Sequence, residues 1–121
     1  MQSVAQCLPE LRELYLYANS QLSDQAFQYL TDPETSVVRK LEAIDLCGCQ
    51  RLSDSSLTQL CLNNQTSLVS LNLTWCLSIT DQGILGGVAH LDNLELLSMF
   101  GNTLITQASL DSLISAHGKD T

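Results

Sequence analysis

Hydrophobic and polar positions recur along the chain in four copies of one pattern. Each copy has leucine-like residues in strand-like alternation, then Asn or Cys, then a hydroxyl residue and an acid ahead of a further apolar stripe. The shared template is LxxLxLxx(N/C)xx(L/I)(S/T)DxxΦ, where Φ is apolar, and its first leucines are Leu11, Leu41, Leu68 and Leu94. Spacings of 30, 27 and 26 residues between these leucines indicate a solenoid of stacked repeats.

Within each copy, two local patterns predict one strand and one helix. Alternation such as Leu71-Asn72-Leu73-Thr74 places leucines on one side and polar residues on the other, as in a strand. A following pair such as Thr80-Asp81 favours a helix start, because a hydroxyl caps free N–H groups and an acid is stabilised at the positive helix end. We therefore predict strands at 13–17, 43–47, 70–74 and 96–100, and helices that begin near residues 24, 54, 81 and 107.

Stacked units of this kind predict the fold class. We expect an α/β leucine-rich-repeat solenoid, a right-handed β-α superhelix with a parallel sheet on its concave face and helices on its convex face. The length of 121 residues suits one domain. Within it, we interpret Gly86-Gly87 as a place of close packing rather than a hinge. The expected domain covers 1–121, with the remnant of an earlier repeat helix followed by repeats at 11–40, 41–67, 68–93 and 94–116.

The hydroxyl–acid pairs are interpreted as helix caps rather than as a catalytic or calcium-binding cluster, because they recur once in each repeat. The fourth copy departs from the template, since Gln107 replaces the acid. The sequence has no nucleophile elbow, phosphate-binding loop, dinucleotide fingerprint or zinc-protease motif, so we predict no enzyme activity and no cofactor. The predicted caps are Ser23, Asp24, Ser53, Asp54, Thr80 and Asp81.

An equivalent position beyond the end of each predicted strand forms a structural ladder through the repeats. It is occupied by Asn19, Cys49, Cys76 and Asn102. We expect these side chains to turn inward and to hydrogen-bond to loop backbone, with the cysteines as weak S–H donors. A zinc site would need two more Cys or His nearby, so we predict structural thiols and no metal.

Composition and charge narrow the classes of partner. Hydrophobic residues make up 45% of the chain, which excludes a disordered protein, and 13 acidic against 5 basic residues argue against nucleic-acid binding. No apolar run reaches the roughly 18 residues of a membrane span, and no secretory signal opens the chain. An odd count of 5 cysteines without such a signal favours reduced thiols in the cytoplasm or the nucleus.

The residues that alternate with the core leucines form the predicted concave face. Four of the chain's aromatic residues fall on this face or its rim, although the leucines already fill the core. Because Tyr and Trp commonly anchor interfaces, we favour a partner-binding surface; alternatively, Tyr17, Trp75 and Phe100 cover the loop edge against each other. The candidate binding residues are Glu13, Tyr15, Tyr17, Asp45, Asn72, Thr74, Trp75, Ser98 and Phe100.

The segments CGCQRLSDSSL (47–57) and LVSLNLTWCLSITDQGIL (68–85) resemble the cysteine-containing leucine-rich repeat. This subtype occurs chiefly in F-box/leucine-rich-repeat proteins, the substrate receptors of cullin-type ubiquitin ligases. The resemblance covers roughly residues 4–116. It implies a protein substrate on the concave face, and a ligase adaptor bound through an F-box that lies outside this chain.

A second interpretation keeps the same fold without the ligase. The chain is then a structural or regulatory leucine-rich-repeat subunit of a larger complex that has no F-box. In either case the predicted concave rows carry no basic residue, whereas a phosphorylated partner would require an arginine cluster. The sequence therefore favours an unmodified or basic protein partner.

Overall fold

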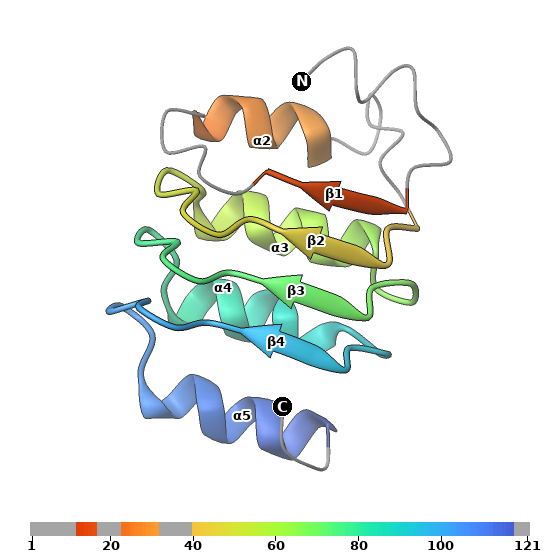
Figure 1. Ribbon diagram of the computed structural model, residues 1–121. Coiled ribbons are helices and arrows are strands. Elements are labelled where there is room, and N and C mark those ends of the chain that lie inside the picture. Colours follow the sequence, from red (N-terminus) through yellow and green to blue (C-terminus); the bar gives the residue numbers. More distant parts are fainter. Residues whose placement is uncertain (1–11, 17–22, 32–39, 118–121) are drawn as a thin grey trace.

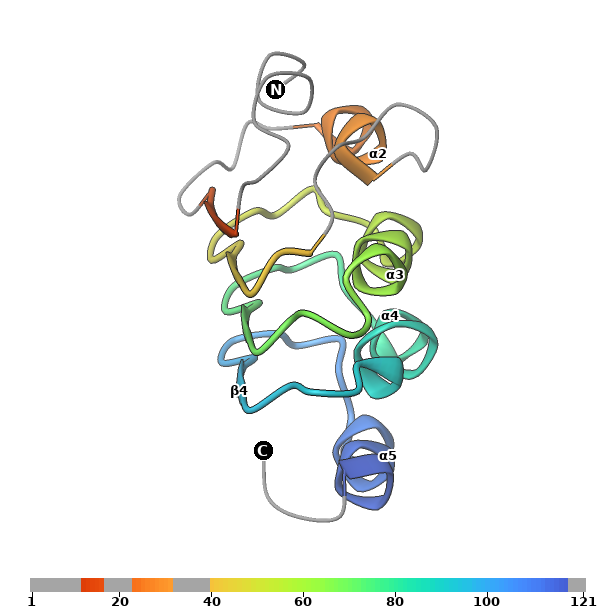
Figure 2. The same ribbon diagram turned by 90° about the vertical axis from the view of Figure 1, so that its right-hand side faces the viewer.

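The structure is a computed structural model that describes residues 12–16, 23–31 and 40–117. Strands and helices alternate along these ranges and form two layers, with the sheet on one side and the helices on the other (Figures 1 and 2). The elements are β1 (Glu13–Tyr15), α2 (Asp24–Thr31), β2 (Ala43–Asp45), α3 (Asp54–Asn63), β3 (Ser70–Asn72), α4 (Asp81–Gly86), the 3-10 helix η1 (Val88–His90), β4 (Leu96–Ser98) and α5 (Gln107–His117).

The sheet confirms the predicted leucine-rich-repeat architecture. Its order is β1-β2-β3-β4 and every neighbouring pair is parallel. The register aligns Leu14, Ile44, Leu71 and Leu97, so the core leucines of successive units stack in one row. The helices begin at residues 24, 54, 81 and 107, as predicted from the repeat pattern.

The strands are shorter than their predicted windows and end two residues earlier. At this point the side chains of Asp45 and Asn72 accept hydrogen bonds from the N–H groups of Cys47 (3.0 Å) and Thr74 (2.9 Å). Such a bond from an Asx side chain to the backbone two residues on starts a turn. Contacts between units nevertheless continue beyond the strands, as in the bond from Trp75 N–H to the carbonyl of Phe100 at 3.0 Å.

Leucines and isoleucines fill the space between the sheet and the helices. Leu46 and Leu73, which directly follow β2 and β3, are fully buried, whereas the equivalent Met99 is only partly buried. The reason is that β4 lies at the edge of the described sheet. Gly87 lets α4 approach α3, since a Cβ atom there would lie 3.0 Å from the Cα of Thr58, so this glycine of the Gly86-Gly87 pair does serve close packing.

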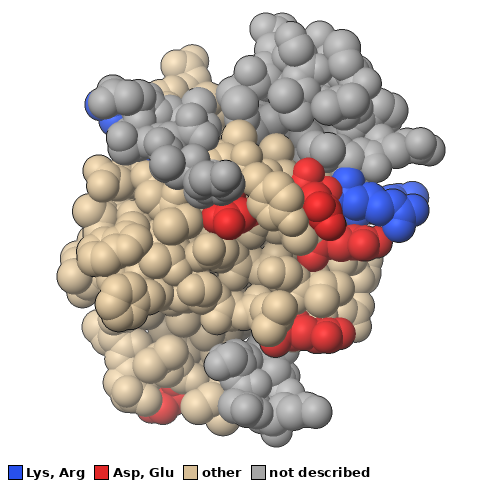
Figure 3. Space-filling model, in the orientation of Figure 1, with Lys and Arg blue, Asp and Glu red and all other residues tan. Residues whose placement is uncertain are grey.

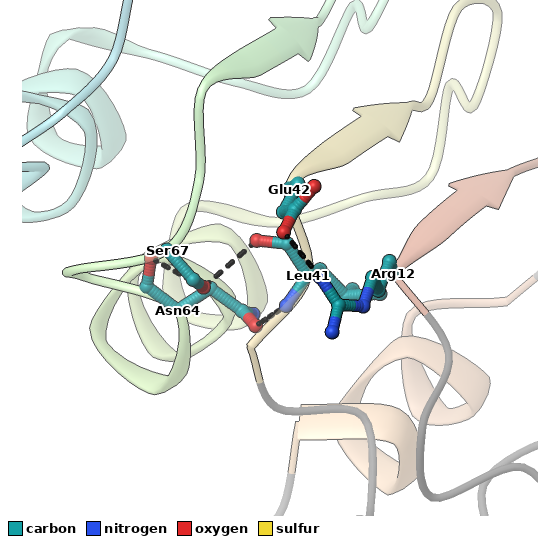
Figure 4. Close-up of polar contacts among 5 residues, drawn as sticks. All are labelled: Arg12, Leu41, Glu42, Asn64 and Ser67. Carbon is teal, nitrogen blue, oxygen red and sulfur yellow. Dashed lines mark hydrogen bonds and ion pairs between the residues drawn. The ribbon is translucent and has the colours of Figure 1, made fainter.

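Buried Asn64 fixes the place where β2 begins (Figure 4). Its Oδ1 accepts from the N–H of Leu41 at 2.8 Å, and its Nδ2 donates to the carbonyl of Leu60 at 2.8 Å. Ser67 donates to the carbonyl of the same Leu41 at 2.8 Å. These bonds satisfy backbone groups that the turn after α3 would otherwise leave buried and unpaired.

Candidate functional site

The candidate site is the face of the sheet that points away from the helices, which we call the concave face. Because the strands are parallel and in register, equivalent residues form rows spaced about 4.8 Å apart. The central row consists of Tyr15, Asp45, Asn72 and Ser98. A shallow hollow of about 340 Å³ runs across all four strands; it is lined by this row together with residues that include Ala43, Ser70 and Leu96.

The other predicted binding residues lie around this hollow. Glu13 is exposed on β1, while Thr74, Trp75 and Phe100 follow the ends of β3 and β4. Thr74 and Ser98 are joined by a hydrogen bond of 2.7 Å between their hydroxyl groups. Tyr17 of the predicted binding set lies outside the described residues, as do Asn19 of the ladder and the predicted remnant of an earlier repeat. The structure therefore brings eight of the nine predicted binding residues onto one face or its rim.

Carboxylates surround Tyr15 at one end of the hollow. Its hydroxyl donates to Oε1 of Glu13 at 3.2 Å, and the residue is 56% exposed. That hydrogen bond raises the pKa of Tyr15, and the nearby charges of Glu13 and Asp45 add to the effect. The phenol therefore stays protonated at neutral pH and presents an exposed ring beside two acids.

Asp45 and Asn72 line the middle of the hollow. Each uses Oδ1 to accept the backbone N–H group two residues on. Within the described ranges, the second carboxylate oxygen of Asp45 and the amide nitrogen of Asn72 have no hydrogen-bond partner. The floor of the hollow thus offers one charged acceptor and one donor to a ligand.

Trp75 and Phe100 form an aromatic pair at the exits of β3 and β4. Their ring centroids are 5.7 Å apart and the planes meet at 87°, an edge-to-face contact. Trp75 is 48% exposed and Phe100 is 72% exposed. Their contact agrees with the interpretation that these rings cover the loop edge against each other. Their exposure nevertheless leaves apolar ring surface that a partner can contact.

Trp75 adopts a backbone conformation that suits glycine. Its φ is 62°, and the residues at the same position of the flanking units are Gly48 with φ 81° and Gly101 with φ 83°. A left-handed conformation costs a non-glycine residue about 1–2 kcal/mol. Backbone strain of this kind concentrates at functional sites. The sequence held a signal for it, namely glycine at this position in two of the units, which the sequence interpretation did not use.

We expect Trp75→Gly to have a free energy of unfolding about 1 kcal/mol higher than Trp75→Ala. Both changes remove the indole, so the comparison isolates the backbone, which glycine relaxes at φ 62°. Urea denaturation followed by circular dichroism would measure the difference. At Thr74, which has no positive φ, the order of the two substitutions should reverse. The same order at both positions would contradict the strain.

Replacing Gly101 by alanine is expected to displace the indole of Trp75. An added Cβ would lie 2.7 Å from Cε3 of Trp75, and φ is already 83°. We expect a loss of more than about 1 kcal/mol in the free energy of unfolding and a shifted emission spectrum of Trp75, the only tryptophan. Gly86→Ala is the control, since its Cβ would meet Thr58 Oγ1 at 3.4 Å; an equal shift in both variants would contradict the packing.

The ladder residues connect successive units beneath the concave face. The thiols of Cys49 and Cys76 are buried and donate to the carbonyls of Leu16 (3.2 Å) and Leu46 (3.0 Å) in the preceding unit. Burial raises the pKa of Cys76 to about 12, so this thiol is protonated at neutral pH. Asn102 differs, because its Oδ1 accepts from the N–H of Cys76 at 3.0 Å while its buried Nδ2 has no described partner.

The acids at the helix starts act differently from the predicted caps. The capping atoms are the hydroxyls, as where Ser53 accepts from Ser56 N–H and Thr80 accepts from Gln82 N–H, each at 3.2 Å. The acids instead reach the next unit along the chain. Asp54 accepts from both the N–H (2.8 Å) and the hydroxyl (2.5 Å) of Thr80.

The same bridge recurs on either side of Asp54. Asp24 accepts from the N–H of Ser53 at 2.9 Å and from the hydroxyl of Ser56 at 2.8 Å. Asp81 accepts from the N–H of Thr106 at 2.8 Å and from the hydroxyls of Thr106 and Ser109. Gln107 takes the place of the acid in the last described unit. The acids therefore join the units into one body, a role that capping alone did not predict.

Acidic solution is expected to weaken these bridges. Partial burial opposes ionisation of Asp24, but the hydrogen bonds from Ser53 and Ser56 outweigh it and lower its pKa; the bonds from Ser109 and Thr106 lower the pKa of Asp81. A lowered folded-state pKa gives stability that is complete above the unfolded value of about 4 and is lost as pH falls through the folded value. As the pH is lowered beneath about 4, the free energy of unfolding should decrease. The decrease should be smaller in the Asp24→Asn variant. Equal pH dependence in both proteins would contradict this.

Neither a metal-binding cluster nor a membrane-spanning helix is present in the described part of the chain. It contains no group of three or more His, Cys, Asp or Glu residues placed to hold a metal ion. Among its helices, none has the length and apolar character needed to cross a membrane. What the geometry offers is a surface with exposed aromatic rings, a carboxylate and an amide donor.

Comparison with known proteins supports the architecture. No protein-family model matches the sequence. A solved structure described as the Rad7 and Elc1 complex from yeast contains a similar chain, with a TM-score of 0.79 and 22% sequence identity. The match covers 92% of this chain and 27% of that chain. The chain thus spans about a quarter of its structural relative and shares with it the leucine-rich-repeat fold.

Proposed function

We propose that the chain is a protein-interaction module that binds a protein partner on its concave face. The observation that carries the proposal is the exposed pair of Trp75 and Phe100, which the apolar core does not require. Large aromatic residues supply much contact area at low entropic cost and often anchor interfaces. The strained backbone of Trp75 adds support, because a glycine there would avoid the strain but would remove the indole.

The finer proposal assigns the module to substrate recognition in an F-box-type receptor of a cullin-RING ubiquitin ligase. Its support is the cysteine-containing repeat pattern of residues 47–57 and 68–85. The yeast protein of similar fold was crystallised in a complex with Elc1, so a solenoid of this type does form protein complexes. In this proposal the chain performs no catalytic step, its adaptor binds outside these residues, and it works in the cytoplasm or the nucleus.

Site-specific photo-crosslinking tests the surface assignment. A photoreactive amino acid would replace either Phe100 on the concave rim or Asp111 on α5, both exposed, in protein made in its native cells. We expect crosslinked protein partners from position 100 and not from position 111. Partners captured from position 111 alone would overturn the concave assignment.

The composition of the native complex separates the two interpretations of the chain. Cullin and adaptor subunits that co-purify with the parent protein would support the receptor function. A stable complex without ligase subunits would reject it and favour a structural or regulatory subunit. Both outcomes are read by mass spectrometry of the same purified material.

A further inference from the structure

We infer, resting on the proposed function, that the concave face binds an extended peptide segment carrying a Lys or Arg and a large apolar side chain. The basic side chain lies on the β1–β2 side of the hollow, at Tyr15 and Asp45. The apolar side chain lies against Trp75 and Phe100, beyond the β3–β4 side of the hollow. The two anchors are separated by about three or four residues of the bound segment.

Charge complementarity selects a basic side chain at the first end. Tyr15 and Asp45 are paired in register on adjacent strands, about 4.8 Å apart. A cation placed there meets the second oxygen of Asp45 and the exposed face of the Tyr15 ring, a combination of ion pair and cation–π contact.

Among the described residues, no Lys or Arg lines the hollow. Arg12 forms its ion pair with Glu42 at 3.0 Å, at the beginning of the strands. Figure 3 shows acidic side chains gathered over the beginnings of the strands, while the surface over the exits of β3 and β4 is largely uncharged. The face therefore changes along its length from acidic to apolar.

The opposite end is apolar and open. Phe100 is 72% exposed and Trp75 is 48% exposed, and their rings contact each other at the exits of β3 and β4. Contiguous exposed apolar surface on a soluble protein commonly marks an interaction site. A leucine, isoleucine or phenylalanine side chain would cover these two rings without leaving a polar group unpaired.

The distance between the two ends sets the spacing in the ligand. Asp45 and Phe100 are two strand gaps and two residues apart, so by strand geometry they are about 12 Å from each other. An extended chain covers that distance in about three or four residues. In the centre, Asn72 lines the hollow, and its amide nitrogen can donate to a carbonyl group of the segment.

The free donor in the hollow favours an extended segment over a helix. Within the described ranges, the amide nitrogen of Asn72 has no hydrogen-bond partner. Carbonyl groups inside a helix already accept N–H groups of the same helix, whereas those of an extended segment are open to such a donor.

A displayed library of random heptapeptides, selected on the full chain, tests the inference. We expect enrichment of peptides with Lys or Arg and a large apolar residue three or four positions apart. In fluorescence titrations, Asp45→Asn should weaken a selected peptide at least tenfold, and should leave unchanged a version with glutamine in place of its basic residue. Asp111→Asn, which changes net charge equally on α5, is the matched control.

The outcomes separate this inference from the proposed function. Selected peptides that change the emission of Trp75 but show no basic residue, or show another spacing, overturn the inference and leave the concave surface supported. Peptides that bind without affecting Trp75 and tolerate Trp75→Gly overturn both. A library that yields no binding peptide rejects the extended segment, and the crosslinking experiment then decides the surface independently.

Discussion

Replacing Leu73 by alanine is expected to lower the free energy of unfolding by about 2–5 kcal/mol. Leu73 is fully buried and its row contains Leu46 on one side and Met99 on the other. The substitution removes apolar contacts in an inner unit, where neighbours on both sides prevent the cavity from collapsing. Because solenoid units stabilise each other through their interfaces, the loss affects more than one unit.

Chemical denaturation followed by circular dichroism measures this effect, and two variants make it specific. Leu77→Ala removes the same atoms from a side chain that is 37% exposed, so its effect should be well under half as large. Met99→Ala, in the partly buried last unit, should fall between the two. Equal losses for Leu73→Ala and Leu77→Ala would show that the inner core is not packed as described.

The fold was predictable because it depends on repeated, short-range patterns. Alternating leucines define the strands, and the same offset from leucine to hydroxyl defines each helix start. A boundary that is ambiguous in one unit can therefore be assigned from the equivalent positions in the other units. The central row of the concave face follows from the same alternation, which placed Tyr15, Asp45, Asn72 and Ser98 together. Strand ends were less predictable, since Asp45 and Asn72 end the strands through side-chain bonds to the turn.

Features that depend on contacts between units were not predictable from one sequence. Alignment of the internal repeats places Trp75 with Gly48 and Gly101. The positive φ of Trp75 and its packing over Gly101 are visible only in the structure. Residues 63–67 form a polar run in the sequence, yet nothing in it indicates that buried Asn64 holds the start of β2. The acids do lie in the first turns of their helices, but their bridges were not predicted, because a bridge depends on contacts between helices.

The acid bridge gives the second large stability effect. Asp54→Ala should lower the free energy of unfolding by about 2–4 kcal/mol, because hydrogen bonds to a charged group contribute about 1.5–3 kcal/mol and the N–H of Thr80 loses its acceptor. Asp92→Ala, which removes an exposed acid outside the bridges, should change it by less than about 0.5 kcal/mol. Similar losses in the two variants would mean that net charge, rather than the bridge, sets the stability.

A double-mutant cycle with Thr80 distinguishes a bridge from a cap. The hydroxyl of Thr80 caps α4 and also donates to Asp54, so Thr80→Ala alone removes both interactions. In the Asp54→Ala background the same change removes only the cap, which costs about 1 kcal/mol. The two single changes should therefore sum to more than the double change, by at least about 0.5 kcal/mol. Additive effects would mean that Asp54 stabilises only its own helix, and the units would then be held together by apolar packing and the ladder alone.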